Sequence, residues 1–268
     1  MSEPAISTPD PSTPDIRIVL VGTQHPGNIG AAARAMKTMG LSRLVLVAPE
    51  KAPDRDTEAM AAGADDLVAA APVHATLAEA VADCALVLGC TARSRRVQLE
   101  QLDPREAALR ALEFAGQGPV ALVFGRERTG LDNNELQLCH AAVHIPSDPA
   151  FSSLNLAAAV QVLSYEVRMA VLGEGGAAPD APPVAQVAVL REGVAPHAEL
   201  EGFFAQLADA LDAIDFHKGR TPDSAMRKLR RLYLRAGLDS AEVRLLRGVL
   251  ADTQRMAMLA AKGPVSKD

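Results

Sequence analysis

Residues 16–40 of the chain read IRIVLVGTQHPGNIGAAARAMKTMG, and this stretch decides the fold class. It opens with a run that is aliphatic except for Arg17. A continuous apolar run is typical of a β-strand buried on both faces, because a half-exposed strand alternates apolar with polar residues. Glycines then interrupt the run, and an Ala-rich segment of helical composition follows. The stretch therefore predicts a strand, a tight loop and a helix over residues 28–39.

The same alternation of strand and helix continues to residue 172. Further apolar runs predict strands at RLVLVA (43–48), CALVLG (84–89), PVALVF (119–124) and AVHIP (142–146). Further segments predict helices at 55–62, 76–82, 104–115, 132–138 and 153–172. Alternating strands and helices form a parallel sheet whose right-handed crossovers place helices on both faces. We expect residues 16–172 to form one α/β domain.

The segments outside this domain differ from it in composition. Residues 1–15 are rich in Pro, Ser, Thr and Asp, which predicts a disordered tail. Residues 173–190 combine Gly, Pro and Ala into a predicted linker. Residues 191–268 have helical patterns at 197–216, 223–236 and 240–260, with Thr221 and Asp239 as N-cap candidates for the last two. They predict a small all-α domain.

The composition of the whole chain excludes several classes of protein. The 268 residues are 49% apolar with a net charge of −6, and no apolar stretch approaches the roughly 20 residues of a membrane span. The N-terminus lacks a basic-then-apolar leader, so we expect a cytoplasmic chain that is neither secreted nor membrane-bound. Neither the histidines nor the cysteines (Cys84, Cys90 and Cys139) show metal-ligand spacing, which predicts no metal site and no disulfide framework.

Basic residues are concentrated in the C-terminal part. Residues 218–247 contain nine Lys and Arg against three acidic residues, a local net charge of +6. Arg227, Arg231 and Arg235 recur every four residues on one face of a predicted helix. Like charges at that spacing repel one another, so helix stability does not explain them. The row is either a solvated face or a phosphate-binding surface, and we favour the second. Aromatics make up only 3% of the chain, which argues against base-stacking platforms.

The first loop, GTQHPGNIG (22–30), looks like a phosphate-binding loop but fails its details. A Walker loop requires Lys and then Ser or Thr after its second glycine, where Asn28 and Ile29 stand, and the spacing of a dinucleotide-binding GxGxxG is also missing. What remains is a tight turn with Asn28 as donor and acceptor, followed by Arg34. Small alanines around Arg34 leave its guanidinium free to reach over the loop, although an ordinary surface arginine is the alternative reading.

Two later loops also gather polar residues at the ends of predicted strands. Residues 124–136, FGRERTGLDNNEL, place Gly125 at the carboxyl edge of a strand, where open α/β sheets bind ligands, ahead of an Asp-capped helix. Residues 145–170, IPSDPAFSSLNLAAAVQVLSYEVRMA, begin a long helix with Ser152 and Ser153 as N-cap candidates and Asn155 in its first turn. Capping explains one serine, so the two hydroxyls and the amide form a polar cluster.

Three blocks in this order, HPGNIGAAARAMKTMGL, LVFGRERTGLDNNEL and SSLNLAAAVQVLSYEVR, resemble the three motifs of the SpoU branch of the SPOUT RNA 2′-O-methyltransferases. The helical tail, with MRKLRRLYLRAG and LLRGVLAD, is similar to that of the members that methylate nucleotide 32 of the tRNA anticodon loop. The resemblance implies a trefoil knot in the C-terminal part of the α/β domain, a homodimer with active sites at the subunit interface, tRNA as substrate and S-adenosylmethionine as cofactor.

The resemblance also implies roles for individual residues. Arg34 activates the ribose 2′-hydroxyl; because a guanidinium keeps its proton, we expect it to bridge the oxygen and the adjacent phosphate, while Asn28 and Ser153 orient either Arg34 or that phosphate. The cofactor-binding set, in which Glu127 is a structural partner, is Cys90, Thr91, Ala92, Gly125, Glu127, Ile145, Ser152, Ser153, Leu154 and Asn155. The RNA-binding set is Arg227, Lys228, Arg230, Arg231 and Arg235.

Alternatives remain open at this point. A SpoU-type enzyme that methylates rRNA or another tRNA position keeps the fold and changes the target. A non-catalytic RNA-binding protein with the same fold is disfavoured by the presence of Asn28, Arg34, Glu127 and Asn155 together. A nicotinamide oxidoreductase lacks its characteristic loop.

Overall fold

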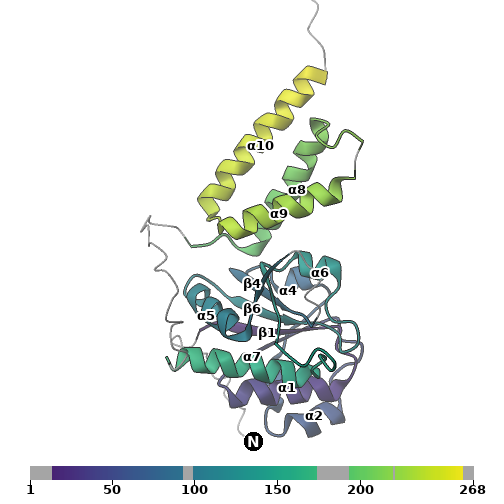
Figure 1. Cartoon of the computed structure of the whole chain (residues 1–268), viewed down its shortest axis with the longest axis vertical. Coiled ribbons are helices and arrows are strands. Elements are labelled where there is room, and N and C mark those ends of the chain that lie inside the picture. The colour runs from purple at the N-terminus through teal and green to yellow at the C-terminus, as the bar shows by residue number, and fades with distance from the viewer. Residues whose placement is uncertain (1–13, 93–98, 174–192, 220, 262–268) are drawn as a thin grey trace, which may run out of the picture.

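The computed structural model describes residues 14–92, 99–173, 193–219 and 221–261. Its centre is a seven-stranded sheet with the order β3-β2-β1-β6-β4-β7-β5, in which every strand pair is parallel (Figure 1). The strands are β1 (Ile16–Val21), β2 (Arg43–Val47), β3 (Val73–His74), β4 (Leu86–Cys90), β5 (Glu100–Leu102), β6 (Val120–Phe124) and β7 (Ala141–Val143). The predicted parallel α/β sheet is confirmed, and the implied knot stays a prediction.

Helices cover both faces of the sheet. They are α1 (Pro26–Thr38), α2 (Arg55–Ala61), α3 (Asp65–Ala70), α4 (Leu77–Ala80), α5 (Pro104–Ala115), α6 (Asn133–Gln137) and α7 (Leu156–Val171). In Figure 1, α1 and α7 lie on one side of the sheet and α4 and α6 on the other. Along β1, Ile18 and Leu20 join the core under α1, α5 and α7, while Val19 and Val21 join the core on the opposite face. Burial on both faces explains the continuous apolar run.

Three elements escaped the sequence analysis, which predicted none of them. Strands β3 and β5 occupy the two edges of the sheet, and their residues include exposed Val73, Glu100 and Gln101, so no apolar run marks them. Helix α3 is six residues long and begins after Ala64, which makes no side-chain cap, so neither a helical period nor a capping residue marks it. The elements that position the carboxyl edge were all predicted within a few residues.

Side-chain caps fix where the helices begin. Asp132 caps α6 by accepting hydrogen bonds from the amides of Asn134 and Glu135 at 2.8 and 2.9 Å, and the side chain of Glu135 accepts from the amide of Asp132 in return. The expectation that Ser152 or Ser153 caps the last helix of the α/β domain is wrong. Helix α7 begins at Leu156, and Asn155 is its N-cap because its Oδ1 accepts from the amide of Ala158 at 3.0 Å.

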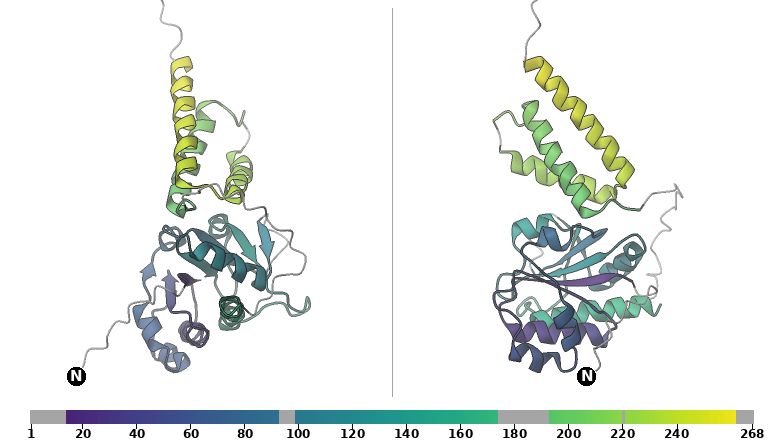
Figure 2. Two further views of the ribbon diagram at one scale, coloured as in Figure 1. Left: turned by 90° about the vertical axis from the view of Figure 1, so that its left-hand side faces the viewer. Right: turned by 180° about the vertical axis from the view of Figure 1, so that it is seen from behind.

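The C-terminal segment forms three helices, α8 (His197–Ala213), α9 (Pro222–Ala236) and α10 (Ser240–Ala261), around a core of their own. Phe203, Phe204 and Tyr233 pack at its centre with ring centroids 4.9–6.5 Å apart. This helical group stands on the side of the sheet that carries α4 and α6 (Figures 1 and 2). Thr221 and Asp239 precede α9 and α10 as predicted, although only Asp239 makes a capping hydrogen bond. The predicted linker, from residue 174 on, and residues 1–13 of the predicted tail lie outside the described residues.

Helix α1 packs closely on α2 because Gly30 has no side chain. A Cβ at this position would lie 2.0 Å from the carbonyl oxygen of Thr57 and 2.8 Å from the amide nitrogen of Ala61. Both are backbone atoms, so relief requires the two helices to separate. A Cβ at Gly27, on the same helix, would lie 3.4 Å from the Met60 side chain and 3.9 Å from the carbonyl oxygen of Asp56, both ordinary van der Waals contacts.

We therefore predict that Gly30→Ala lowers the free energy of unfolding by about 1–3 kcal/mol, the usual cost of overpacking. Gly27→Ala is the matched control and should leave stability unchanged or raise it slightly, since alanine restricts the unfolded chain. Denaturant titrations of both variants provide the measurement. Equal destabilisation of the two variants would contradict this account of the α1–α2 packing.

Candidate functional site

A cavity of about 680 Å³ opens at the carboxyl ends of β4, β6 and β7. Three loops form its walls, one after each strand, as expected for a ligand site in an open parallel sheet. The volume falls within the range of cofactor sites, roughly 300–1,000 Å³. The lining combines apolar residues with hydroxyls, carboxylates and backbone from Cys90, Thr91, Ala92, Phe124–Asn133, Leu136, Ile145, Ser152–Leu154, Leu156 and Ala159.

The structure brings almost all of the predicted cofactor-binding residues to this cavity. Nine of the ten line it: Cys90, Thr91, Ala92, Gly125, Glu127, Ile145, Ser152, Ser153 and Leu154. Asn155 does not, because its carboxamide caps α7. The sequence analysis named Gly125 and Glu127 from the second loop but missed Arg128 and Thr129, although both lie within the quoted motif.

Main-chain geometry shapes the loop after β6. Arg126 and Gly130 exchange backbone hydrogen bonds of 3.2 and 2.8 Å, which closes a tight turn over the cavity. A Cβ on Gly125 would lie 2.2 Å from the backbone of Gly130 and Leu131, so only glycine fits at this position. Gly130 itself has φ +70°. This part of the wall is therefore shaped by close packing of the main chain.

Glu127 connects the first and second motifs. Its carboxylate accepts hydrogen bonds from the amides of Gln24 (2.9 Å) and His25 (3.2 Å) and from the Asn28 side-chain amide (2.9 Å). Burial opposes ionisation of Glu127, but these hydrogen bonds outweigh it and hold its pKa below the usual value of 4.5. The role of Asn28 visible in this structure is thus to hold Glu127, and through it the α1 loop, against the cavity wall.

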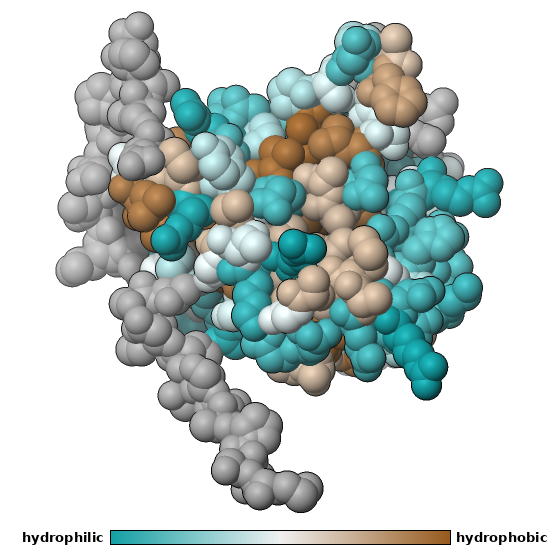
Figure 3. All heavy atoms as spheres, turned by 90° about the horizontal axis from the view of Figure 1, so that it is seen from below, coloured by the Kyte–Doolittle hydropathy of each residue, from teal (hydrophilic) through white to brown (hydrophobic). Residues whose placement is uncertain are grey.

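Arg34 stands apart from the cavity of its own chain. It is exposed on α1 and does not belong to the lining residues. Within the described segments it makes no hydrogen bond or ion pair. The single chain therefore brings together nine residues of the cofactor set, Ser153 among them, and Asn28 through its bond to Glu127, but not the predicted catalytic arginine. The face of the domain that carries α1 and α7 shows apolar side chains gathered at its middle, with polar ones around them (Figure 3).

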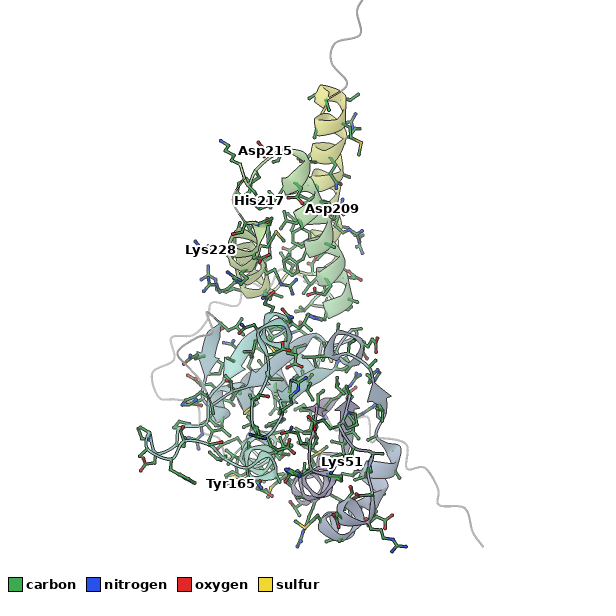
Figure 4. The ribbon with its side chains drawn as sticks, turned by 90° about the vertical axis from the view of Figure 1, so that its right-hand side faces the viewer. Lys51, Tyr165, Asp209, Asp215, His217 and Lys228 are labelled. Carbon is green, nitrogen blue, oxygen red and sulfur yellow. The ribbon has the colours of Figure 1, made fainter. Side chains whose placement is uncertain are left out.

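A second cavity of about 340 Å³ lies between α9 and α6. Four residues of the predicted RNA-binding set line it: Arg227, Lys228, Arg230 and Arg231. Lys228 projects outward from α9 (Figure 4). Arg235 does not line this cavity. We call this second cavity the basic cleft. Asn133 and Leu136 of α6 belong to the linings of both cavities, so the basic cleft and the larger cavity meet at this short helix.

Arg230 departs from its predicted role. Its guanidinium donates to both carboxylate oxygens of Glu201, at 2.5 and 3.0 Å, and to the carbonyl oxygen of Gln137 at 3.1 Å. It also lies 4.3 Å from the centre of the Phe204 ring, and its side chain is only 13% exposed. Because these groups occupy the guanidinium, Arg230 ties α9 to α8 and α6 rather than offering a phosphate contact.

Two histidines complete the contact between the helical group and the sheet domain. The rings of His140 and His197 lie 5.8 Å apart, and the amide of His197 donates to the carbonyl oxygen of Cys84. Burial lowers the pKa of His140 to about 3 and of His197 to about 4. Both rings are therefore neutral at physiological pH, and they do not repel Arg230.

The described residues contain no cluster of histidines, cysteines and carboxylates that would hold a metal ion. In the same parts of the chain, no helix has the length and apolar character needed to cross a membrane. Burial raises the pKa of each of the three cysteines to about 12, so the Cys90 thiol in the cavity wall stays protonated.

Comparison with known proteins links both parts of the chain to named families. The SpoU rRNA methylase family model matches residues 15–165, and the model of the C-terminal domain of the tRNA methyltransferase TrmJ matches residues 198–262. The tRNA (cytidine/uridine/adenosine-2′-O-)-methyltransferase TrmJ of Pseudomonas aeruginosa is 52% identical over 90% of this chain and 95% of its own. The tRNA (cytidine/uridine-2′-O-)-methyltransferase TrmJ of Salmonella typhimurium is 49% identical over 90% and 97%.

Solved structures agree with these matches. The crystal structure of TrmJ from Z. mobilis superimposes with a TM-score of 0.73 at 37% identity, covering 88% of this chain and 97% of the other. A probable methylase family protein from Haemophilus influenzae has a TM-score of 0.57 at 42% identity, covering 92% of this chain and 98% of the other.

The hydrogen bonds of Glu127 predict a pH-dependent contribution to stability. Because the folded pKa lies below 4.5, the contribution is fully present above that value and is lost as the pH falls through the folded pKa. We expect Glu127→Gln to destabilise the protein most near neutral pH, with the difference from wild type shrinking below about pH 4.5. Unfolding titrations between pH 7 and pH 3.5 measure it. Asp209→Asn, which removes an exposed carboxylate on α8 (Figure 4), should show no such trend.

Proposed function

The chain belongs to the SpoU rRNA methylase family, and on that premise we propose that it is an S-adenosylmethionine-dependent tRNA 2′-O-ribose methyltransferase acting on nucleotide 32 of the anticodon loop. Cytidine, uridine or both are the targets. The observation that carries the proposal is the cavity at the carboxyl ends of β4, β6 and β7, which gathers the second and third family motifs around one space. Relatives named as tRNA 2′-O-methyltransferases, matched over 90% of this chain, support the substrate class.

The cavity residues fit S-adenosylmethionine by size and by chemistry. When bound, this cofactor supplies a methyl group on a positively charged sulfur. The Cys90–Ala92 segment and the turn around Gly125 would hold the adenosine and the methionine through backbone groups, and Ile145 and Leu154 would offer it apolar contact, since all of them line the cavity. Ser152 and Ser153 offer hydroxyls at the same wall. Shape and main-chain polarity therefore select the ligand, and few charged side chains are required.

The exposed position of Arg34 favours an active site that two subunits share. We place the homodimer contact on the face of α1 and α7, where apolar side chains gather (Figure 3). Arg34 does not reach the cavity of its own chain. In the dimer, Arg34 of the partner subunit enters that cavity instead. There its guanidinium, which keeps its proton, holds the phosphate next to the target ribose and stabilises negative charge developing on the 2′-oxygen.

Arg34→Ala should lower the rate of methyl transfer by about 10²–10³-fold or more, the usual cost of removing a donor to a developing oxyanion. Cofactor affinity should stay within about twofold of wild type, because in the proposed site Arg34 contacts the RNA phosphate and the 2′-oxygen and not the cofactor. Transfer of a labelled methyl group to tRNA gives the rate, and calorimetry gives the affinity. Lys37→Ala, one turn further along α1, is the matched control. Near-normal turnover of the Arg34 variant would exclude the assigned role.

In this proposal, the basic cleft is the surface that binds the RNA. Arg227 and Arg231 line it, and phosphate binding is recognised by its salt dependence. Arg227→Glu combined with Arg231→Glu should weaken tRNA binding and reduce the slope of log affinity against log salt by about one for each phosphate that is no longer bound. Cofactor affinity should not change. Arg255→Glu on α10, outside the cleft, is the control. If the slope of log affinity against log salt is unchanged in the double variant, the RNA-binding surface lies elsewhere.

A second candidate target is rRNA, because the matched family model carries that substrate in its description. The match of residues 198–262 to a tRNA methyltransferase domain favours tRNA. Mass spectrometry of digested tRNA and rRNA from cells with and without the protein decides between them. Absence of one ribose methylation at nucleotide 32 in cells without the protein is the expected result. A change in rRNA alone, or at another tRNA position, would refute the proposed target.

A further inference from the structure

Phe151 is the most exposed large apolar side chain in the described parts of the structure, with 84% of its surface open to solvent. A single exposed apolar residue is not unusual. The position of Phe151 is unusual, because the two residues that follow it, Ser152 and Ser153, line the cofactor cavity. The chain has six phenylalanines and no tryptophan, and it places one of these few rings directly before two residues of the cavity lining.

Hydrogen bonds hold the loop that presents this ring. The amide of Phe151 donates to the carbonyl oxygen of Asp148 at 3.0 Å, and the Asp148 carboxylate accepts from the amide of Ala150 at 2.7 Å. The Ser147 hydroxyl donates to the carbonyl oxygen of Ser152 at 3.0 Å. The loop between β7 and α7 reaches outward from the domain (Figure 2). The ring is therefore held outward by a structured turn.

The other wall of the cavity adds a cation. Arg128 is exposed, lines the cavity, and makes no ion pair or hydrogen bond among the residues that the structure describes. The two carboxylates in the lining are already used, since Glu127 binds the α1 loop and Asp132 caps α6. A cation on the β6 loop and an aromatic ring on the β7 loop, two loops that both contribute to this cavity, match a nucleotide strand, because the phosphate needs a positive charge and an unstacked base needs a flat apolar partner.

We propose that Phe151 stacks on an unpaired base of the RNA next to the methylated nucleotide, and that Arg128 contacts the phosphate of the same strand. This inference rests on the proposed function and narrows its substrate to nucleotides in a loop, whose bases are free to unstack. A second copy of the chain is the other occupant to consider. The surroundings disfavour it, because the neighbouring exposed residues are polar (Asp148, Ser152, Ser153) or small (Pro149, Ala150), whereas the core of a dimer contact is rich in large apolar side chains.

The test separates stacking from simple apolar contact. Phe151→Ala and Phe151→Leu should raise the KM for unmodified tRNA transcript by at least about fivefold, the lower end of the measured range for base stacking. Phe151→Tyr should retain the wild-type KM, because it keeps the ring. Cofactor affinity and melting temperature should not change in any of the three, since the side chain is exposed. A wild-type KM in Phe151→Leu would overturn the proposal.

A spectroscopic experiment observes the contact directly. Because the chain contains no tryptophan, Phe151→Trp introduces a single indole fluorophore. An anticodon stem-loop RNA should quench its emission at the concentrations at which it binds, and a fully paired duplex should not. Phe216→Trp, exposed near the end of α8, is the matched control and should not be quenched. The absence of quenching at Phe151→Trp while the RNA binds would refute stacking.

Two further readouts separate this inference from its premises. Light scattering reports the oligomeric state; conversion of a dimer to a monomer by Phe151→Ala would show that the ring contacts a second copy, against the proposal. If wild-type protein methylates no tRNA, the proposed function fails. The quenching titration then still decides whether an RNA loop stacks at Phe151, so the two failures are distinguishable.

Discussion

The Glu127 carboxylate is the interaction on which the site depends. It lies on the loop after β6, yet its hydrogen-bond donors, Gln24, His25 and Asn28, come from the loop after β1, about a hundred residues earlier. Partial burial of a carboxylate is unfavourable unless its oxygens are satisfied, so the two loops stabilise each other. Adjacent parallel strands bring the loops to one edge, and Glu127 fixes their spacing. The start of α1, and with it the direction in which Arg34 projects, follows from this anchor.

The interior of the sheet was predictable from the sequence and its margins were not, for one physical reason. Central strands are buried on both faces and leave continuous apolar runs, whereas β3 and β5 pair on one side only and include exposed residues. The loops of the cofactor cavity were predictable because parallel strands end at one edge. The roles of Asn155 and Arg230 were not predictable. The first depends on the residue at which α7 begins, and the second on which groups pack against α9. The spacing of residues along the sequence predicts neither feature.

Helix α6 joins the two parts of the protein. Its residues line both the cofactor cavity and the basic cleft, and its last residue, Gln137, accepts a hydrogen bond from Arg230 of α9. Neutral His140 and His197 lie close together where the helical group meets the sheet domain. The position of the basic helix relative to the cavity is therefore set by buried contacts, and an RNA held in the cleft has a defined route toward the methyl donor in the proposed reaction.

The main-chain wall around Gly125 has a consequence for how such an enzyme changes over time. A ligand held through peptide groups is indifferent to most replacements of the surrounding side chains, so long as the polypeptide keeps its path. Along this turn the intolerant positions are those where a Cβ collides with the facing backbone, as at Gly125, where that atom would lie 2.2 Å away, and those whose side chains hold the loops, as Glu127 does. In the proposed reaction, the remaining positions of this turn are thereby expected to accept substitutions while the methyl donor still binds, which leaves the surrounding surface open to adapt to new RNA targets.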